Sequence, residues 1–351
     1  MPASMATDSC IHWIKRLEQP VSRFLSICGL NRSFPNDATG SDTLTKMQDT
    51  THKVAKRHAA FVGVVVVSGL LFSKMLGTLV AYALHNDSSS HILIVPFISL
   101  YIFFMERRRV LSVTSTSIGP GTATLAAGVL VWIADKYFLQ LSGNDPLSMA
   151  MLSFVLILIG GFLLCYGVAA FRAGMFPVLF LLLMIPLPDS VLDKTIYMLQ
   201  LGSTEITYGL FEMAGIPVLK QGFLLSVPGV TIEVAKECSS IRSSIALFIT
   251  CLVAAHFYLR TWWKTLLFVM LSLPLALIKN GIRIATLTLL SIYVDPGFLK
   301  GNLHHDGGFV FFLVALLIMW PVLELLHRSE GPRVFPNRET QGVVESRVVQ
   351  S

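Results

Sequence analysis

The sequence has few charged residues and few cysteines, and each scarcity excludes a class of protein. Only 14% of the 351 residues are charged, whereas soluble domains carry about 25%. The five cysteines are odd in number and show no metal-ligand spacing, which argues against a disulfide framework or a zinc module. The net charge is +6, but the basic residues stand at the ends of apolar runs and form no patch interleaved with aromatics. A nucleic-acid partner is therefore not expected.

Long apolar runs dominate the rest of the chain. A run of about 20 apolar residues crosses the bilayer as a helix, because lipid leaves every backbone polar group to be paired within its own segment. The runs are continuous and do not alternate, which excludes a transmembrane barrel. We predict an all-α polytopic membrane helix bundle with about eight transmembrane helices, at 59–84, 92–105, 121–141, 147–170, 174–187, 241–258, 263–294 and 309–326. The seventh is expected to be interrupted at Pro274 and at the polar group that follows it.

The spans define the domain organisation. Residues 1–52 form a polar N-terminal extension without a signal peptide, expected to be partly disordered. Residues 53–328 form the transmembrane domain, and 329–351 a disordered tail. Between spans five and six, residues 188–240 are an amphipathic and irregular segment: helical spacing over 191–213 predicts an amphipathic helix, and GFLLSVPGVTIEV predicts strands.

The distribution of lysine and arginine predicts the orientation. Basic residues cluster in every second connection, as the positive-inside rule requires for cytoplasmic segments: Lys53, Lys56, Arg57, Arg107, Arg108, Arg109, Arg172, Arg260, Lys264, Arg328 and Arg333. Both termini are therefore expected in the cytoplasm of a bacterium, with the chain in the inner membrane. The 188–240 segment and the loop before the eighth span are expected on the periplasmic face.

Three polar clusters converge on that face, at 237–242, 280–283 and 304–308. Ionisable residues at membrane depth indicate function by default, although a single Arg can also snorkel to the interface. Cys238 precedes the sixth span, where a helix N-terminus favours a nucleophilic thiolate, and Arg242 is one turn further on. The alternative is a packed, inert cysteine.

The other two clusters supply the remaining groups of a reactive site. His304 can exchange protons near neutral pH, and Arg283 can hold an oxyanion or a carboxylate. The alternatives are a surface histidine and a salt bridge that closes the bundle. A metal site is a further alternative, because five potential ligands are expected outside: His85, His91, His304, His305 and Asp306. Since no HExxH-like spacing occurs, we expect no metal and no cofactor.

At these residues the sequence resembles the exosortase/archaeosortase family of membrane-embedded cysteine transpeptidases, over roughly 56–327. The similar elements, in chain order, are Ser90-His91 with PFISLYIFFMERR, FPVLFLLLMIPLP at 176–188, Glu237-Cys238-Ser239-Ser240-Ile241-Arg242, Asn280-Gly281-Ile282-Arg283-Ile284, and His304 four residues before Gly308. Two departures are Ser240, where the family more often has Gly, and Glu237 before the Cys.

The resemblance implies that Cys238 is the nucleophile, Arg283 the electrostatic stabiliser and His304 the acid–base residue. Supporting residues are expected at Arg242, Glu237, Asn280, His305 and His91. The implied partners are exported proteins with a C-terminal signal, made of a short Pro-Glu-Pro-like (PEP-CTERM-like) motif, one transmembrane helix and a basic tail. The implied reaction is cleavage of that signal and transfer to an acceptor.

Two other functions remain open from the residues alone. A transporter or an envelope-polysaccharide assembly factor would need no nucleophile, and the broken seventh span is the feature in its favour, although no internal repeat is evident. A metal-dependent intramembrane enzyme would use the external histidines.

Overall fold

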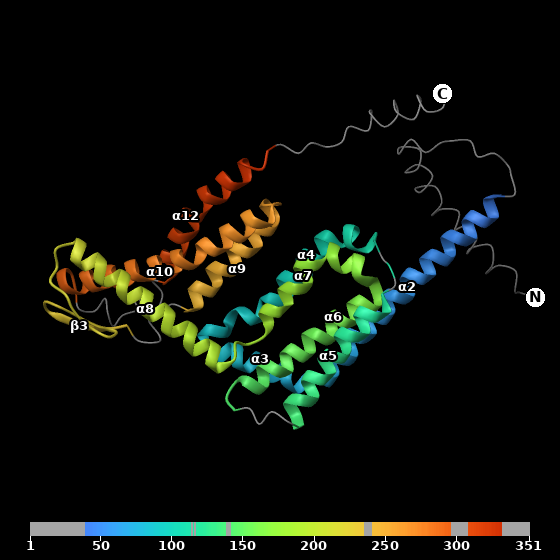
Figure 1. The fold of residues 1–351 in the computed structure, drawn as a ribbon, viewed down its shortest axis with the longest axis horizontal. Coiled ribbons are helices and arrows are strands. Elements are labelled where there is room, and N and C mark those ends of the chain that lie inside the picture. The colour runs from blue at the N-terminus through green and yellow to red at the C-terminus, as the bar shows by residue number, and fades with distance from the viewer. Residues whose placement is uncertain are drawn as a thin grey trace, which may run out of the picture. The chain divides into compact units, whose positions relative to one another are not determined.

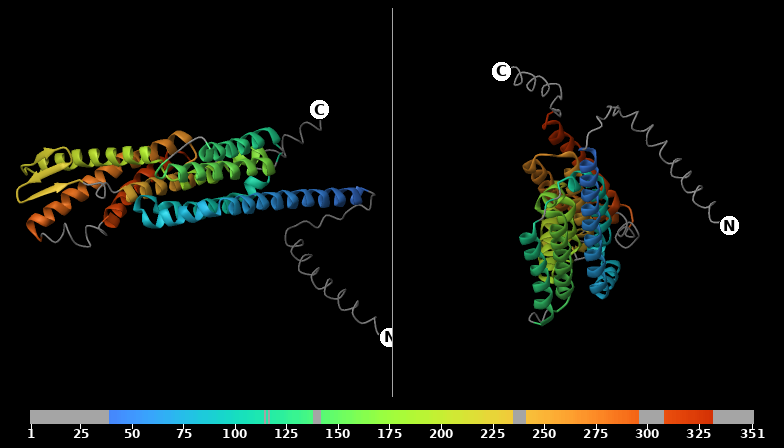
Figure 2. Two further views of the ribbon diagram at one scale, coloured as in Figure 1. Left: turned by 90° about the horizontal axis from the view of Figure 1, so that it is seen from below. Right: turned by 90° about the vertical axis from the view of Figure 1, so that its right-hand side faces the viewer.

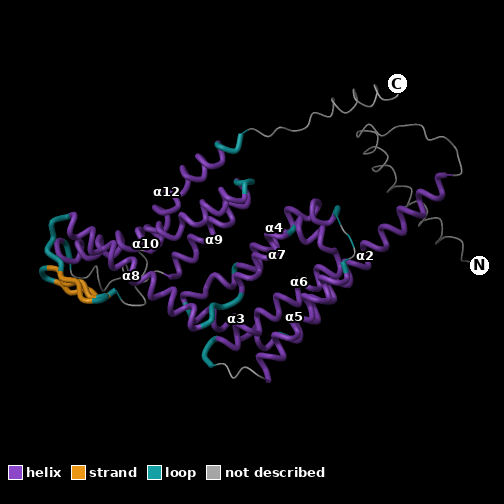
Figure 3. Tube along the Cα trace, in the orientation of Figure 1, coloured by secondary structure: helices purple, strands orange, loops and turns teal. Residues whose placement is uncertain are grey.

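The computed structural model describes residues 39–113, 115, 117–137, 142–234, 241–295 and 308–331. The chain divides into two compact units, residues 1–59 and 60–351. The first unit contributes the start of helix α2 (Thr39–Leu71), and the architecture below is that of the second. Almost all of the described chain is helical, with one small sheet (Figure 3).

Seven helical segments of the described chain are long and apolar enough to cross a membrane. They are Val54–Leu71, Ser88–Leu111, Ile118–Tyr137, Asp145–Ala173, Ile241–Tyr258, Trp262–Tyr293 and Gly308–Arg328. An eighth is added if the bent pair Met175–Met184 and Asp189–Met213 counts as one span. The predicted all-α multi-pass architecture is thereby confirmed (Figure 1).

The first predicted span is divided into two helices. Helix α2 begins at Thr39, inside the segment expected to be irregular, and ends at Leu71. Helix α3 (Ser73–His85) starts beyond Phe72, whose backbone has left the helical region. A 3-10 helix, η1 (Asp87–Leu93), then leads into α4 (Val95–Leu111).

The fifth predicted span, 174–187, is shorter than expected. Only α7 (Met175–Phe180) and the 3-10 helix η2 (Leu181–Met184) are helical, and the next helix, α8 (Asp189–Met213), is turned by 91°. Proline causes this break, because a residue before proline is pushed out of the helical region. Ile185 precedes Pro186 and is extended. The helical spacing at 191–213 predicted α8 correctly.

The prediction that the seventh span is interrupted is wrong. Helix α10 (Trp262–Tyr293) runs unbroken through Pro274 and through the polar residues after it. Proline removes one backbone donor from a helix, but a helix packed among others tolerates this loss. The polar residues are accommodated because they pack against neighbouring helices, as described below.

Glycines bring α5 (Ile118–Tyr137) and α6 (Asp145–Ala173) into close contact. A Cβ on Gly121 would lie 2.7 Å from the Leu164 side chain, and one on Gly160 would lie 2.6 Å from the Leu125 backbone nitrogen. The Ser153 hydroxyl donates to the Gly128 carbonyl at 2.8 Å. Small residues that allow backbones to approach, with a hydrogen bond between helices, are typical of packing in lipid.

A small sheet packs against the ends of two helices. Strands β1 (Leu219–Gln221), β2 (Leu224–Val227) and β3 (Val230–Glu233) pair antiparallel in the order β1-β2-β3. Strands β2 and β3 lie in the segment predicted to form strands, whereas β1 was not predicted. They lie beside the C-terminal ends of α8 and α10 (Figures 1 and 2). The shared core consists of Phe211, Leu225, Val227, Val234, Ile284 and Ala285.

Helices α9 (Ile241–Tyr258), α10 and α12 (Gly308–Arg328) pack together through a second apolar core. At the start of α10, Glu330 accepts hydrogen bonds from the backbone N–H groups of Arg260 and Thr261. Thr261 caps the start of α10 and Arg260 precedes it, so neither N–H has a partner inside that helix. Glu330 therefore ties the end of α12 to the beginning of α10.

Candidate functional site

A group of polar side chains, all but one of them buried, lies where α10 packs against α8 and α9. It consists of Ser203 on α8, Ser243 on α9, and Lys279, Asn280 and Arg283 on α10, and we call it the polar junction. The Lys279 ammonium donates to the Ser243 hydroxyl at 2.5 Å. The Asn280 side-chain amide donates to the Ser203 hydroxyl at 2.8 Å. The junction thus joins three helices by hydrogen bonds between side chains.

Two glycines bring α8 and α10 close enough for these contacts. A Cβ on Gly281 would lie 2.5 Å from Cγ2 of Ile206, and one on Gly202 would lie 2.9 Å from Cδ1 of Leu277. Thr207 also donates to the Gly281 carbonyl at 3.3 Å. Only residues without a side chain permit this approach, so the glycines set the distance over which Asn280 reaches α8.

The junction faces the protein and not the lipid. Lys279, Asn280 and Arg283 are 5%, 1% and 9% exposed. Ile278 and Ile282, on another face of α10, are 43% and 40% exposed. Because a charge buried in an apolar medium is costly unless it is compensated, two cations held here indicate a functional site more strongly than surface cations would.

The length of α10 gives the depth of the junction. The helical rise puts Arg283 roughly 30 Å from Trp262, which is about the thickness of the hydrocarbon core. The exposed Trp262 and Trp263 at the start of the helix are residues that favour the membrane interface. Arg283 therefore lies about one membrane thickness from that interface, and the last part of α10 packs against α8 and the sheet.

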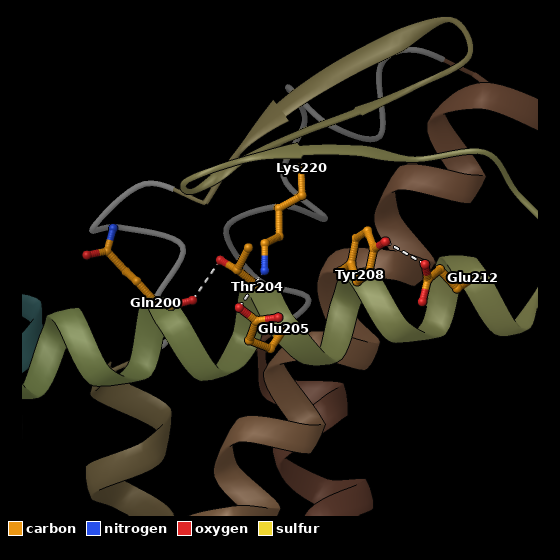
Figure 4. Close-up of polar contacts among 6 residues, drawn as sticks. All are labelled: Gln200, Thr204, Glu205, Tyr208, Glu212 and Lys220. Atoms are coloured by element: carbon orange, nitrogen blue, oxygen red, sulfur yellow. Dashed lines mark hydrogen bonds and ion pairs between the residues drawn. The ribbon is translucent and has the colours of Figure 1, made fainter.

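The outer face of α8 carries a second set of polar contacts, which hold the sheet in place (Figure 4). The Lys220 ammonium on β1 pairs with Glu205 at 2.5 Å and lies 5.4 Å from the Tyr208 ring centroid. Tyr208 donates to Glu212, one turn further along α8. Nearer the start of α8, the buried Gln200 amide donates to the Val234 carbonyl, just after β3. These contacts fix the end of the chain segment that leads toward residue 238.

The structure describes four of the predicted site residues. Arg283 and Asn280 lie in the polar junction, within one turn of each other on α10. Arg242 lies in the first turn of α9 and is exposed, whereas its neighbour Ser243 contacts Lys279. His91 is half-buried in η1, which packs against α9.

The predicted nucleophile and acid–base residue lie outside the described residues. These are Cys238 and His304, together with Glu237 and His305. Among residues that the structure does describe, no three His, Cys, Asp or Glu side chains are grouped to hold a metal ion. The potential ligands His304, His305 and Asp306 are not in that part of the chain.

The sequence prediction left three members of the junction out of the site: Lys279, Ser243 and Ser203. A signal for Lys279 was present, because it lies four residues before Arg283 in an apolar helix and therefore shares its face. The two serines gave no such signal, since serine is common in membrane helices, and only the packing of α8 and α9 on α10 identifies them.

Comparison with known proteins identifies the family. The model of the transmembrane exosortase family matches residues 83–321. The chain belongs to the transmembrane exosortase family. The match includes the polar junction and also the positions of Cys238 and His304. No curated protein and no solved structure matches the chain.

Proposed function

We propose that this exosortase is a cysteine peptidase and transpeptidase. In this proposal it cleaves the C-terminal sorting signal of exported proteins at the outer face of the bacterial inner membrane and transfers them to an acceptor. The observation that carries the proposal is the buried Arg283 in the polar junction, in a chain whose family match spans all three proposed catalytic residues.

The chain connections support a common site. Cys238 precedes Ile241, the first residue of α9, by three residues, and three residues of chain reach at most about 11 Å. Ser243, two residues into α9, contacts Lys279 in the junction. His304 precedes Gly308, the first residue of α12, which packs on α9 and α10.

The proposed reaction uses these groups in two steps. The Cys238 thiolate attacks the scissile carbonyl, and the Arg283 guanidinium stabilises the negative charge that develops on the carbonyl oxygen. His304 gives a proton to the departing amine, which leaves a thioester on Cys238. An acceptor amine or water then attacks the thioester and regenerates the thiol.

The structure also bears on the transporter alternative. The broken seventh span, which favoured a transporter, is absent because α10 is one continuous helix. One helix pair among the described residues, 175–184 and 189–213, is bent by 91° at a short break, and helix α6 has a kink at Gly167, whose backbone is not helical. A transporter would usually carry such breaks in corresponding positions of two repeats, and no internal repeat is evident in the sequence.

Thiol labelling in intact cells tests the proposal. In a variant that keeps only Cys238, with the other four cysteines changed to Ser, a membrane-impermeant maleimide should react rapidly from outside. His304→Ala and Arg283→Ala should each slow the reaction, because both groups favour the thiolate. Failure to label after the outer barrier is permeabilised would contradict the proposed site, as would full processing of a signal-bearing partner by Cys238→Ala.

A further inference from the structure

We propose that Lys279, with Arg283 beside it, binds a carboxylate group of the peptide substrate and so determines substrate specificity. The inference rests on the proposed function, since it names the substrate chemistry that the same site recognises. Lys279 is not among the proposed catalytic residues, and it acts here by holding the peptide and not by taking part in bond cleavage.

Lys279 holds a buried ammonium group next to a neutral partner. Lys279 is 95% buried, since its exposed fraction is 5%, and its hydrogen bond is to a neutral hydroxyl, that of Ser243. Ion pairs between described residues join Lys220 to Glu205, His256 to Glu106 and Arg328 to Glu324, and none of these pairs includes Lys279. A buried cation without an anionic partner is costly, so the resting protein holds a positive charge that a ligand can neutralise.

Arg283 makes the same place more positive. Residues four apart on a helix are neighbours, with Cβ atoms about 5–6 Å apart, and like charges at that spacing repel each other. The protein keeps both cations on one helix in the bundle interior, although each raises the cost of the other. An anion between or beside them would relieve both the repulsion and the burial, whatever groups of the protein Arg283 also contacts.

The direction of approach favours a peptide over a lipid headgroup. The exposed residues of this part of α10 are Ile278 and Ile282, whereas Lys279 is buried. The α8 side is closed by the contact of Gly281 with Ile206. Lys279 instead faces α9 through Ser243, the helix that follows Cys238 in the chain. A carboxylate of a peptide held at the proposed nucleophile would meet Lys279 from that side.

A second buried lysine on the same helix provides a matched control. Lys264 is 8% exposed, and its ammonium donates to the Ser329 hydroxyl at 2.8 Å. It therefore shares the burial and the serine partner of Lys279, but it lies at the other end of α10. Replacement of either lysine by Met removes a buried charge of the same kind, and only one of the two is in the proposed binding site.

The experiment uses the full chain in nanodiscs of zwitterionic lipid. The probes are reporter proteins with one transmembrane helix and an Arg-rich tail, in which a single Glu, or in matched reporters a Gln, is moved through the residues before the helix. We expect wild type to prefer one Glu position. Lys279→Met should raise KM for that reporter on the order of 30-fold or more, as loss of one partner of a buried charge pair does. In the same variant, kcat for the Glu reporter and KM for the Gln reporters should change little. Lys264→Met should leave the preference for the Glu position unchanged.

A charge exchange keeps the test valid if Lys279→Met folds poorly. Lys279→Glu should cleave the Glu reporter poorly, and it should cleave a reporter that carries Lys at the same position. Cys238-dependent cleavage without any Glu preference, or with a preference that survives in Lys279→Met, would overturn the inference alone. Absence of Cys238-dependent cleavage of every reporter would overturn the proposed function as well. A Lys279 effect that appears only when phosphatidylglycerol is added would assign the site to a lipid phosphate and overturn the peptide reading.

Discussion

The contact of α8 with α10 at Gly281 predicts opposite effects for two similar substitutions. Alanine stabilises a helix relative to glycine by about 1 kcal/mol. In Gly281→Ala the new methyl group would lie 2.5 Å from Cγ2 of Ile206, and such overpacking costs about 1–3 kcal/mol. In Gly209→Ala, on α8, the methyl group meets nothing within 4 Å, so only the stabilising term remains. The difference between the two variants should therefore be about 1–3 kcal/mol.

The exposure of the buried Cys251 thiol can measure this difference. Cys251 lies in the core shared by α9, α10 and α12, and a variant in which the other cysteines are replaced by Ser reports unfolding through its reaction with a thiol dye. We expect the unfolding midpoint to rise for Gly209→Ala and to fall, or to rise by much less, for Gly281→Ala. Equal increases for both would refute the close approach of the two helices and, with it, the geometry of the polar junction.

Two further predictions concern single contacts. Asn280→Ala should destabilise the protein by about 1–3 kcal/mol, because it removes the amide that donates to the buried Ser203 hydroxyl. In a double-mutant cycle, the free-energy cost of Asn280→Ala with Ser203→Ala should be less than the sum of the two single costs. Partial burial acts to raise the pKa of Glu330, but hydrogen bonds from Thr261 and Arg260 and the charge of Lys264 outweigh it and lower the pKa below its usual 4.5. The stabilisation should therefore be fully present above about pH 4.5 and be lost as the pH falls through the lowered value, so that wild type and Glu330→Gln differ in unfolding midpoint at pH 7 and converge in acid. A difference that does not decrease at any acid pH below 4.5 at which the protein stays folded would contradict this assignment.

The membrane-spanning architecture could be predicted from the sequence because a run of apolar residues alone is enough to specify a helix in lipid. Local rules also predicted α8 and the strands β2 and β3. The same rules failed at Pro274, since the effect of a proline depends on whether neighbouring helices compensate for the missing donor. They gave the end of the fifth span only to within a few residues, since its helical part stops at Met184, before Pro186.

The site was less accessible to sequence reasoning than the fold. Arg283 and Asn280 were identified because polar residues in an apolar helix require an explanation. Their surroundings were not, because the contacts with Ser203 and Ser243 join residues 77 and 36 positions apart. Those contacts depend on how closely α8 and α9 approach α10, which is a property of packing and not of any single segment.

The glycine contacts between α8 and α10 have a mechanical consequence. Even a small separation of α8 from α10 would lose the close contacts at Gly202 and at Gly281 at the same time. Helices α8 and α10 should therefore move as one rigid body, and the sheet should move with them. Any opening that admits a peptide to the junction should therefore leave the contact between α8 and α10 intact.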